Sequence, residues 1–147
     1  MAFFRRLPAI AQSFFSLPRW VIVWVLLVLI PVNTASFAVL GTPSGQWAAI
    51  AWIFVIAANT GTLFYYGGIT KSMSIPHLVA WVPLEIFLLT RLAGGEMETA
   101  SAEFGYAILL VVINGISLVF DVYDSFRWLR GEREVAARGS GSAANRR

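Results

Sequence analysis

Four apolar runs, each long enough to cross a bilayer, constrain this chain more than any other feature of its sequence. About 20 residues of α-helix span the roughly 30 Å of hydrocarbon in a membrane. With 58% apolar and 13% charged residues, a soluble domain of 147 residues could not bury so much apolar surface. We expect transmembrane helices at about 20–40, 47–66, 76–92 and 104–123.

Short connections between these runs predict an all-α membrane protein built as an antiparallel four-helix transmembrane bundle. The turn at 41–45 contains two glycines and a proline, and Gly67 and Gly68 follow the second run. The expected regions are an N-terminal segment at 1–19, the bundle at 20–124, and a basic C-terminal segment at 125–147.

The placement of positive charge predicts that both termini are cytoplasmic, in a multi-pass protein of the cell (inner) membrane. Arg5, Arg6 and Arg19 precede the first run, and Lys71 lies in the middle connection. Six further arginines follow the fourth run. The opposite orientation would require nearly all of these charges to cross the membrane.

The first nineteen residues have the pattern of an amphipathic helix that lies in the inner membrane interface. Their apolar side chains recur every three or four positions, at Phe3, Leu7, Ile10, Phe14 and Leu17. Because Pro8 and Pro18 interrupt this segment, a frayed apolar tail is the alternative.

The basic residues beside the spans predict contacts with the lipid bilayer and with anionic lipid head groups. These residues are Arg5, Arg6, Arg127, Arg130 and Arg133. Because the arginines flank apolar spans, membrane orientation explains them more simply than nucleic-acid binding, and no nucleic-acid partner is expected. Beyond about residue 131 the chain loses its apolar content, and we expect disorder there.

The chain has no cysteine and a single histidine, His77. Disulfides, thiolate metal sites, iron–sulfur clusters and cysteine nucleophiles are therefore excluded. A two-histidine metal or haem site would need a second chain. The sequence also lacks a phosphate-binding glycine loop and a serine–histidine–acid grouping, so neither a cofactor nor a metal is expected. An intramembrane or lipid-modifying enzyme is the least favoured function.

Deep inside the hydrocarbon, each expected span carries one strongly polar residue: Asn33, Asn59, Glu85 and Asn114 in chain order. Polar side chains are costly in hydrocarbon, so each of them is a candidate for proton or ion binding. Antiparallel helices can bring all four toward the middle of the bundle. A purely structural polar core, in which asparagines satisfy the glutamate, is an equal alternative.

Glu85 is the leading candidate, because a carboxylate in an apolar bundle has its charged form disfavoured and can exchange a proton or a cation. His77 and Trp81 precede Glu85 at intervals of four, so the three residues share one helix face. They outline a proton path from the cytoplasm that runs about 12 Å along the helix. Taken alone, His77 is more simply interpreted as an interfacial residue at a helix start.

Two acidic residues, Asp121 and Asp124, lie near the inner end of the fourth run. We expect them to form interfacial ion pairs with Arg127 and Arg130, rather than a cation-binding vestibule. Arg91, at the outer end of the third run, is expected to reach outward or to meet an acidic residue of the next loop.

These observations leave two functional hypotheses. One is a homo-oligomeric proton- or cation-linked transporter or permeation protein, in which Glu85 is the titrating group. The oligomer belongs to this hypothesis because four helices are few to enclose a pathway. The other is a non-catalytic accessory or assembly subunit of a larger membrane complex, in which the polar residues only join helices.

Overall fold

The computed structural model describes the backbone of residues 2–136 and the side chains from residue 6 onward. Within that range the elements are all helical, and four segments are long and apolar enough to cross a membrane. This confirms the expected all-helical fold with four apolar spans. The contacts predicted for Arg5 lie outside the described residues, as does the part of the predicted disordered tail at residues 137–147.

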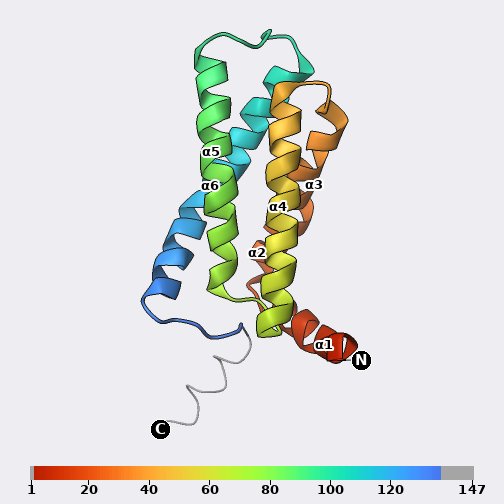
Figure 1. The fold of residues 1–147 in the computed structure, drawn as a ribbon, viewed down its shortest axis with the longest axis vertical. Coiled ribbons are helices and arrows are strands. Elements are labelled where there is room, and N and C mark those ends of the chain that lie inside the picture. Colours follow the sequence, from red (N-terminus) through yellow and green to blue (C-terminus); the bar gives the residue numbers. More distant parts are fainter. Residues whose placement is uncertain (1, 137–147) are drawn as a thin grey trace.

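Successive spans run in opposite directions, so residues 2 and 136 lie at the same end of the bundle (Figure 1). We call this the terminal end, and we call the opposite end, where α4 and α6 begin, the loop end. The four spans are Arg19–Val39, Pro43–Tyr66, Lys71–Ala93 and Ala102–Leu129.

The first span is a segmented helix, whereas the sequence predicted a continuous one. It consists of α2 (Arg19–Trp24), a π-helical turn (Val25–Leu29), α3 (Ile30–Thr34) and a 3₁₀ turn (Ala35–Val39). Pro31 explains the wide turn before it, because proline donates no hydrogen bond and its ring crowds the carbonyl four residues earlier.

Local sequence signals set both ends of α4 (Pro43–Tyr66). Thr42 caps its start, where the hydroxyl oxygen accepts a hydrogen bond from the Gly45 N–H at 3.1 Å, and Pro43 occupies the first turn. Gly67 closes the helix in the left-handed conformation with φ 69°, which glycine adopts without steric cost. The helix thus begins at Pro43 rather than near residue 47.

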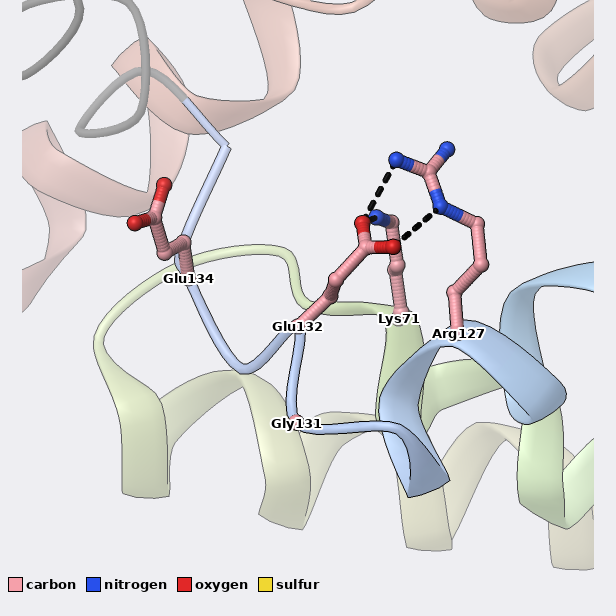
Figure 2. Close-up of a pocket in the computed structure, with 5 residues that line it drawn as sticks. All are labelled: Lys71, Arg127, Gly131, Glu132 and Glu134. Atoms are coloured by element: carbon pink, nitrogen blue, oxygen red, sulfur yellow. Dashed lines mark hydrogen bonds and ion pairs between the residues drawn. The ribbon is translucent and has the colours of Figure 1, made fainter.

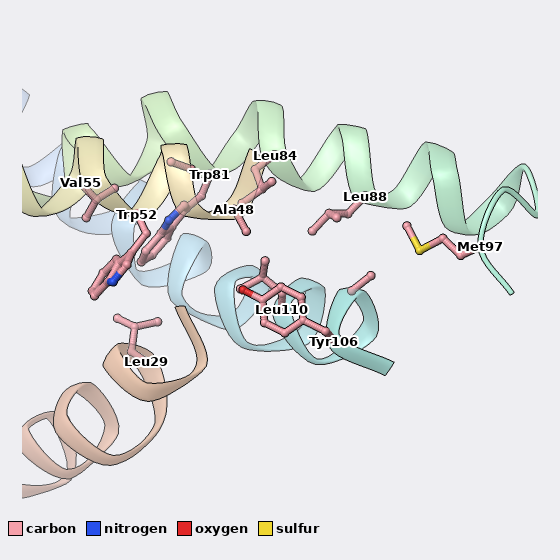
Figure 3. Packing of buried hydrophobic residues seen from close by; sticks show 12 residues of the cluster. Leu29, Ala48, Trp52, Val55, Trp81, Leu84, Leu88, Met97, Tyr106 and Leu110 are labelled. Carbon is pink, nitrogen blue, oxygen red and sulfur yellow. The ribbon is translucent and has the colours of Figure 1, made fainter. Parts of the chain in front are cut away.

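The remaining spans extend beyond the expected runs. A 3₁₀ turn (Lys71–Met73) leads into α5 (Ser74–Ala93), and α6 (Ala102–Leu129) is capped by Ser101, whose hydroxyl accepts from the Phe104 N–H. Side chains from α4, α5 and α6 converge in the core, where Trp81, Leu88 and Leu110 are almost wholly buried (Figure 3).

The short helix α1 (Ala2–Phe15) lies at the terminal end, turned away from the long axes of the spans (Figure 1). Among the described side chains of α1, Ser13 is the buried one, and its hydroxyl accepts a hydrogen bond from the Ile69 N–H at 2.8 Å. Arg6 donates hydrogen bonds to carbonyls at the end of α4. The bundle covers the apolar side of α1 only in part, since Leu7 is 41% exposed whereas Ile10 and Phe14 are half-buried.

The interior of the bundle holds polar residues beside its apolar core, and the outer surface of the spans is apolar. Its buried polar residues include Asn33, Ser36, Ser44, Glu85 and Asn114. Large aliphatic and aromatic side chains cover the outer faces of all four spans, with examples at Leu27, Ile53, Ile86 and Val119 that are more than half exposed. In water such a surface would be an aggregation hazard, whereas hydrocarbon solvates it.

Candidate functional site

His77, in the first turn of α5, joins three helices at the terminal end of the bundle. Its Nδ1–H faces both carboxylate oxygens of Asp121 on α6, at 3.1 Å each. Its Nε2 lies 2.9 Å from the amide nitrogen of Asn59 on α4, from which it can accept a hydrogen bond. The His77 and Asp121 side chains are 18% and 14% exposed, so the cluster lies just inside the surface.

The amide of Asn59 can follow a change in the protonation of His77. While Nε2 carries no proton, Asn59 donates its N–H to it, and the amide oxygen of Asn59 is buried without a hydrogen-bond partner. If Nε2 gains a proton, it becomes a donor, and rotation of the amide would present that oxygen as its acceptor. Both protonation states of His77 can therefore be hydrogen-bonded at this position.

Glu85 lies two helical turns beyond His77, toward the loop end. Its side chain is on α5, the residue is 8% exposed, and one carboxylate oxygen has no hydrogen-bond partner. Trp81 lies between the two residues, with its ring stacked on the imidazole at 4.3 Å between centroids and 12° between planes. The indole N–H of Trp81 is also buried without a partner. An unpartnered buried carboxylate is a candidate proton- or cation-binding group.

Asn33 and Asn114 form a separate pair in the interior, between α3 and α6. Asn33 donates to the Asn114 side-chain oxygen at 2.9 Å and to the Leu29 carbonyl at 3.0 Å, and Asn114 donates back at 3.3 Å. Both residues are fully buried. The asparagines thus satisfy each other, and neither one hydrogen-bonds to Glu85 in the described part of the chain.

The expected ion pair between Asp121 and the arginines near the end of α6 is wrong, because Asp121 binds His77. Six residues of helix separate Asp121 from Arg127, which turns their side chains about 120° apart. Asp121 therefore faces the bundle, on the same side as the buried Ser117 and Ser125. Arg127 instead binds Glu132, at 2.9 Å from its Nε.

A polar cluster at the loop end ties three helices together. Arg91 of α5 forms an ion pair with Glu103 in the first turn of α6, and Ser44 of α4 hydrogen-bonds to both side chains. Arg91 also reaches Glu96, at 3.1 Å, in the loop that follows α5, as one of the two sequence alternatives predicted. Glu103 itself lies in the first turn of α6, two residues after the cap residue Ser101, and not in the loop.

A second cluster of ion pairs lies at the terminal end of the bundle. Lys71 and Arg127 both bind the carboxylate of Glu132, which follows α6 (Figure 2). Hydrogen bonds from these two cations lower the pKa of Glu132 to about 2. Gly131, with φ 102°, makes the backbone turn that brings Glu132 back over the helix end.

Among the described residues, no group of three or more histidine, aspartate and glutamate side chains is placed to hold a metal ion. The sequence candidates therefore fall into three arrangements: Asn59 with His77, Asn33 with Asn114, and Glu85 without a hydrogen-bonded partner for one oxygen. Comparisons with models of protein families, with characterised proteins and with solved structures found no match to this chain.

Proposed function

We propose that this chain is a multi-pass protein of the cell (inner) membrane, with both termini cytoplasmic, that moves protons or exchanges them for a cation through Glu85. The apolar outer surface of the four spans supports membrane insertion. The position of Lys71, Arg127, Arg130 and Arg133 at the terminal end supports the orientation, because cytoplasmic loops are enriched in basic residues.

The observation that carries the proposal is the succession of ionisable groups from the terminal end toward the interior. Asp121 and His77 lie just below the surface, and Glu85 lies two turns deeper with a free carboxylate oxygen. Protons enter at the Asp121–His77 pair, where the Asn59 amide adapts to either form of the imidazole. Glu85 then accepts the proton, and the Trp81 ring separates the two positions.

The pathway needs more than one copy of the chain. Beyond Glu85 toward the loop end, Leu88, Leu110 and Tyr106 fill the interior of this single bundle. The ion pair between Arg91 and Glu103 then closes its end. In a homo-oligomer, symmetry-related bundles would complete the route on the far side of Glu85.

Proton flux into proteoliposomes that contain only this chain tests the proposal. A potassium diffusion potential would drive protons inward, and an enclosed pH-sensitive dye would report them. Glu85→Gln keeps the side-chain shape and removes the titrating group, so flux falls to the level of empty vesicles. Glu98→Gln, in the exposed loop after α5, is the matched control and leaves flux unchanged. Equal flux through both variants and the unchanged chain would contradict a role for Glu85.

Because the chain has no natural cysteine, single cysteines introduced one at a time map its orientation. A membrane-impermeant maleimide added to intact cells should label a cysteine at Thr99, in the loop-end connection, and spare one at Ser72. Labelling of both positions in permeabilised cells is the control. The reverse pattern in intact cells would overturn the proposed orientation.

A second candidate function, an accessory or assembly subunit of a larger complex, is favoured by the Asn33–Asn114 pair. The side-chain amides of these two residues hydrogen-bond to each other, so neither offers a free group to a transported ion. This is expected of side chains that only join helices. In that case the apolar outer faces would pack against foreign spans. Co-purification of other chains separates this function from autonomous transport.

A further inference from the structure

The terminal end contains a hollow whose lining has the chemistry of a phosphate site. It has a volume of about 400 Å³ and is lined by Lys71, Arg127, Gly131, Glu132 and Glu134 (Figure 2). A lysine ammonium and an arginine guanidinium from different parts of the chain converge there on one carboxylate. The same pairing of a forked guanidinium with a point cation binds phosphate oxygens in proteins.

We propose that this hollow binds the phosphodiester of one anionic phospholipid, and that Glu132 is an internal anion which the lipid head group replaces. The proposal depends on the membrane insertion proposed above, but not on proton movement through Glu85. It assigns a defined site to the generic lipid contacts expected of the basic residues.

Charge and accessibility make the exchange feasible. A phosphodiester carries one negative charge, as the Glu132 carboxylate does, so the replacement conserves the charge next to the two cations. The Lys71, Arg127 and Glu132 side chains are 26%, 38% and 45% exposed, so a ligand can reach all three. Glu132 follows the end of α6 in a non-helical segment, and its side chain can swing out without unfolding a helix.

The surroundings of the hollow favour a lipid over a soluble phosphate. Tyr123 and Tyr65 are exposed near this end of the bundle, at 60% and 76%, as aromatic residues are at the head-group level of a bilayer. Arg130 lies 4.1 Å over the ring of Phe126, and Arg133 lies 5.7 Å from that of Trp128. These arginines add positive charge beside the hollow, and anionic lipids of the cytoplasmic leaflet are attracted to such clusters.

Lipid retention in native mass spectrometry tests the site. The full chain is reconstituted in equal parts of phosphatidylglycerol and phosphatidylcholine, extracted gently, and its bound lipids are counted. Glu132→Gln removes the internal competitor, so retention of phosphatidylglycerol should rise about fivefold, the factor expected for one unit of charge near such a surface. Retention of phosphatidylcholine should not change.

Glu134→Gln is the matched control, because Glu134 lines the same hollow but points away from Lys71 and Arg127 (Figure 2). It loses the same charge and should alter phosphatidylglycerol retention much less than Glu132→Gln. An equal rise in both variants would reduce the effect to general surface charge and overturn the proposed site. No rise in either variant would overturn it as well.

Two further measurements test the two cations and distinguish a lipid head group from soluble phosphate as the ligand. The double variant Lys71→Gln/Arg127→Gln should lose the retained phosphatidylglycerol, and unchanged retention in that variant, if it is folded, would contradict the proposal. Millimolar inorganic phosphate should not release the lipid from the unchanged chain. Release under that condition would assign the hollow to soluble phosphate and overturn the lipid assignment. All of these readouts are independent of proton flux.

Discussion

Asn33 and Asn114 donate hydrogen bonds to each other across the interior of the bundle, at 2.9 and 3.3 Å. The pair links α3, the helical turn that follows the π-helical segment, to the middle of α6. It therefore fixes the segmented first span at the point where its helical hydrogen bonding changes. Two complementary amides achieve this without a charge, which would be more costly in an apolar interior.

A double-mutant cycle on this pair should yield a coupling free energy of about 0.5–2 kcal/mol, the range for hydrogen bonds between membrane helices. Each single change, Asn33→Ala or Asn114→Ala, leaves the partner amide buried with an unmet hydrogen bond. The double change removes both groups, so it should destabilise the protein less than the sum of the single changes. Unfolding in mixed detergent micelles measures all four proteins. Strictly additive losses would show that the two amides are not coupled.

Gly45 should not tolerate alanine, because a Cβ atom there would lie 2.1 Å from the Val39 carbonyl oxygen. That carbonyl is held by both the backbone and the hydroxyl of Thr42, so it cannot move freely. We expect Gly45→Ala to cost about 1–3 kcal/mol of folding free energy, as overpacking does.

Gly61, in the same helix, is the control for this substitution because nothing lies within 4 Å of its added Cβ. Gly61→Ala should leave the thermal midpoint unchanged or raise it slightly, since alanine favours helix. Equal midpoints for the two variants would show that the turn into α4 is looser than described.

Glu103 should stabilise the loop end far more than Glu96, although Arg91 contacts both carboxylates. The Glu103 side chain is 14% exposed and also binds Ser44, whereas the Glu96 side chain is 61% exposed. We expect Glu103→Gln to cost about 1–3 kcal/mol, as for a shielded charged hydrogen bond. Glu96→Gln should cost less than about 1 kcal/mol, as exposed pairs do. Thermal unfolding of the two variants compares them, and a larger loss for Glu96→Gln would contradict this ranking.

The ion pairs that Glu132 forms with Lys71 and Arg127 should persist to low pH, because the two cations lower the pKa of Glu132 to about 2 from an ordinary value of 4.5. A carboxyl group whose pKa is lowered by folding stabilises the fold above its ordinary pKa. That contribution is lost as the pH falls toward 2. Carbon-13 NMR of the Glu132 carboxyl would follow the titration.

Salt provides a second check on these ion pairs of Glu132, because dissolved ions screen exposed charges. Molar sodium chloride or Arg127→Gln should raise the pKa of Glu132 toward its ordinary value. An unchanged titration after Arg127→Gln would show that Arg127 does not hold the carboxylate.

The apolar runs were sufficient to predict the spans, because length and hydropathy alone decide which segments can cross hydrocarbon. The turn residues Thr42, Gly67 and Ser101 also act locally, so the ends of the helices near them follow from neighbouring sequence. The division of the first span was not predictable in the same way. Pro31 indicates a disturbance, but whether it produces a kink, a π-turn or a 3₁₀ turn depends on what packs around it.

The partners of the polar residues could not be read from the sequence, because rotation of each helix about its axis decides them. Asn33, Asn59 and Asn114 looked equivalent, yet two of them pair with each other and the third binds His77. Asp121 was assigned to arginines that follow it along the chain, but its helix face points to His77 instead. Glu85 was expected to be hydrogen-bonded by the asparagines. The structure leaves one of its carboxylate oxygens without a hydrogen-bond partner, and Trp81 precedes it on the same helix face.

We propose that copies of this chain alone form the pathway around Glu85. The most direct test is the native mass of the complex extracted in nanodiscs from its own host membrane, with every co-purifying chain identified. A mass equal to two or more whole copies of this 16.2 kDa chain, plus lipid, is the predicted result, and the mass of a single copy would contradict it. Foreign chains present in fixed stoichiometry would contradict autonomous transport and make this protein a subunit of a larger complex.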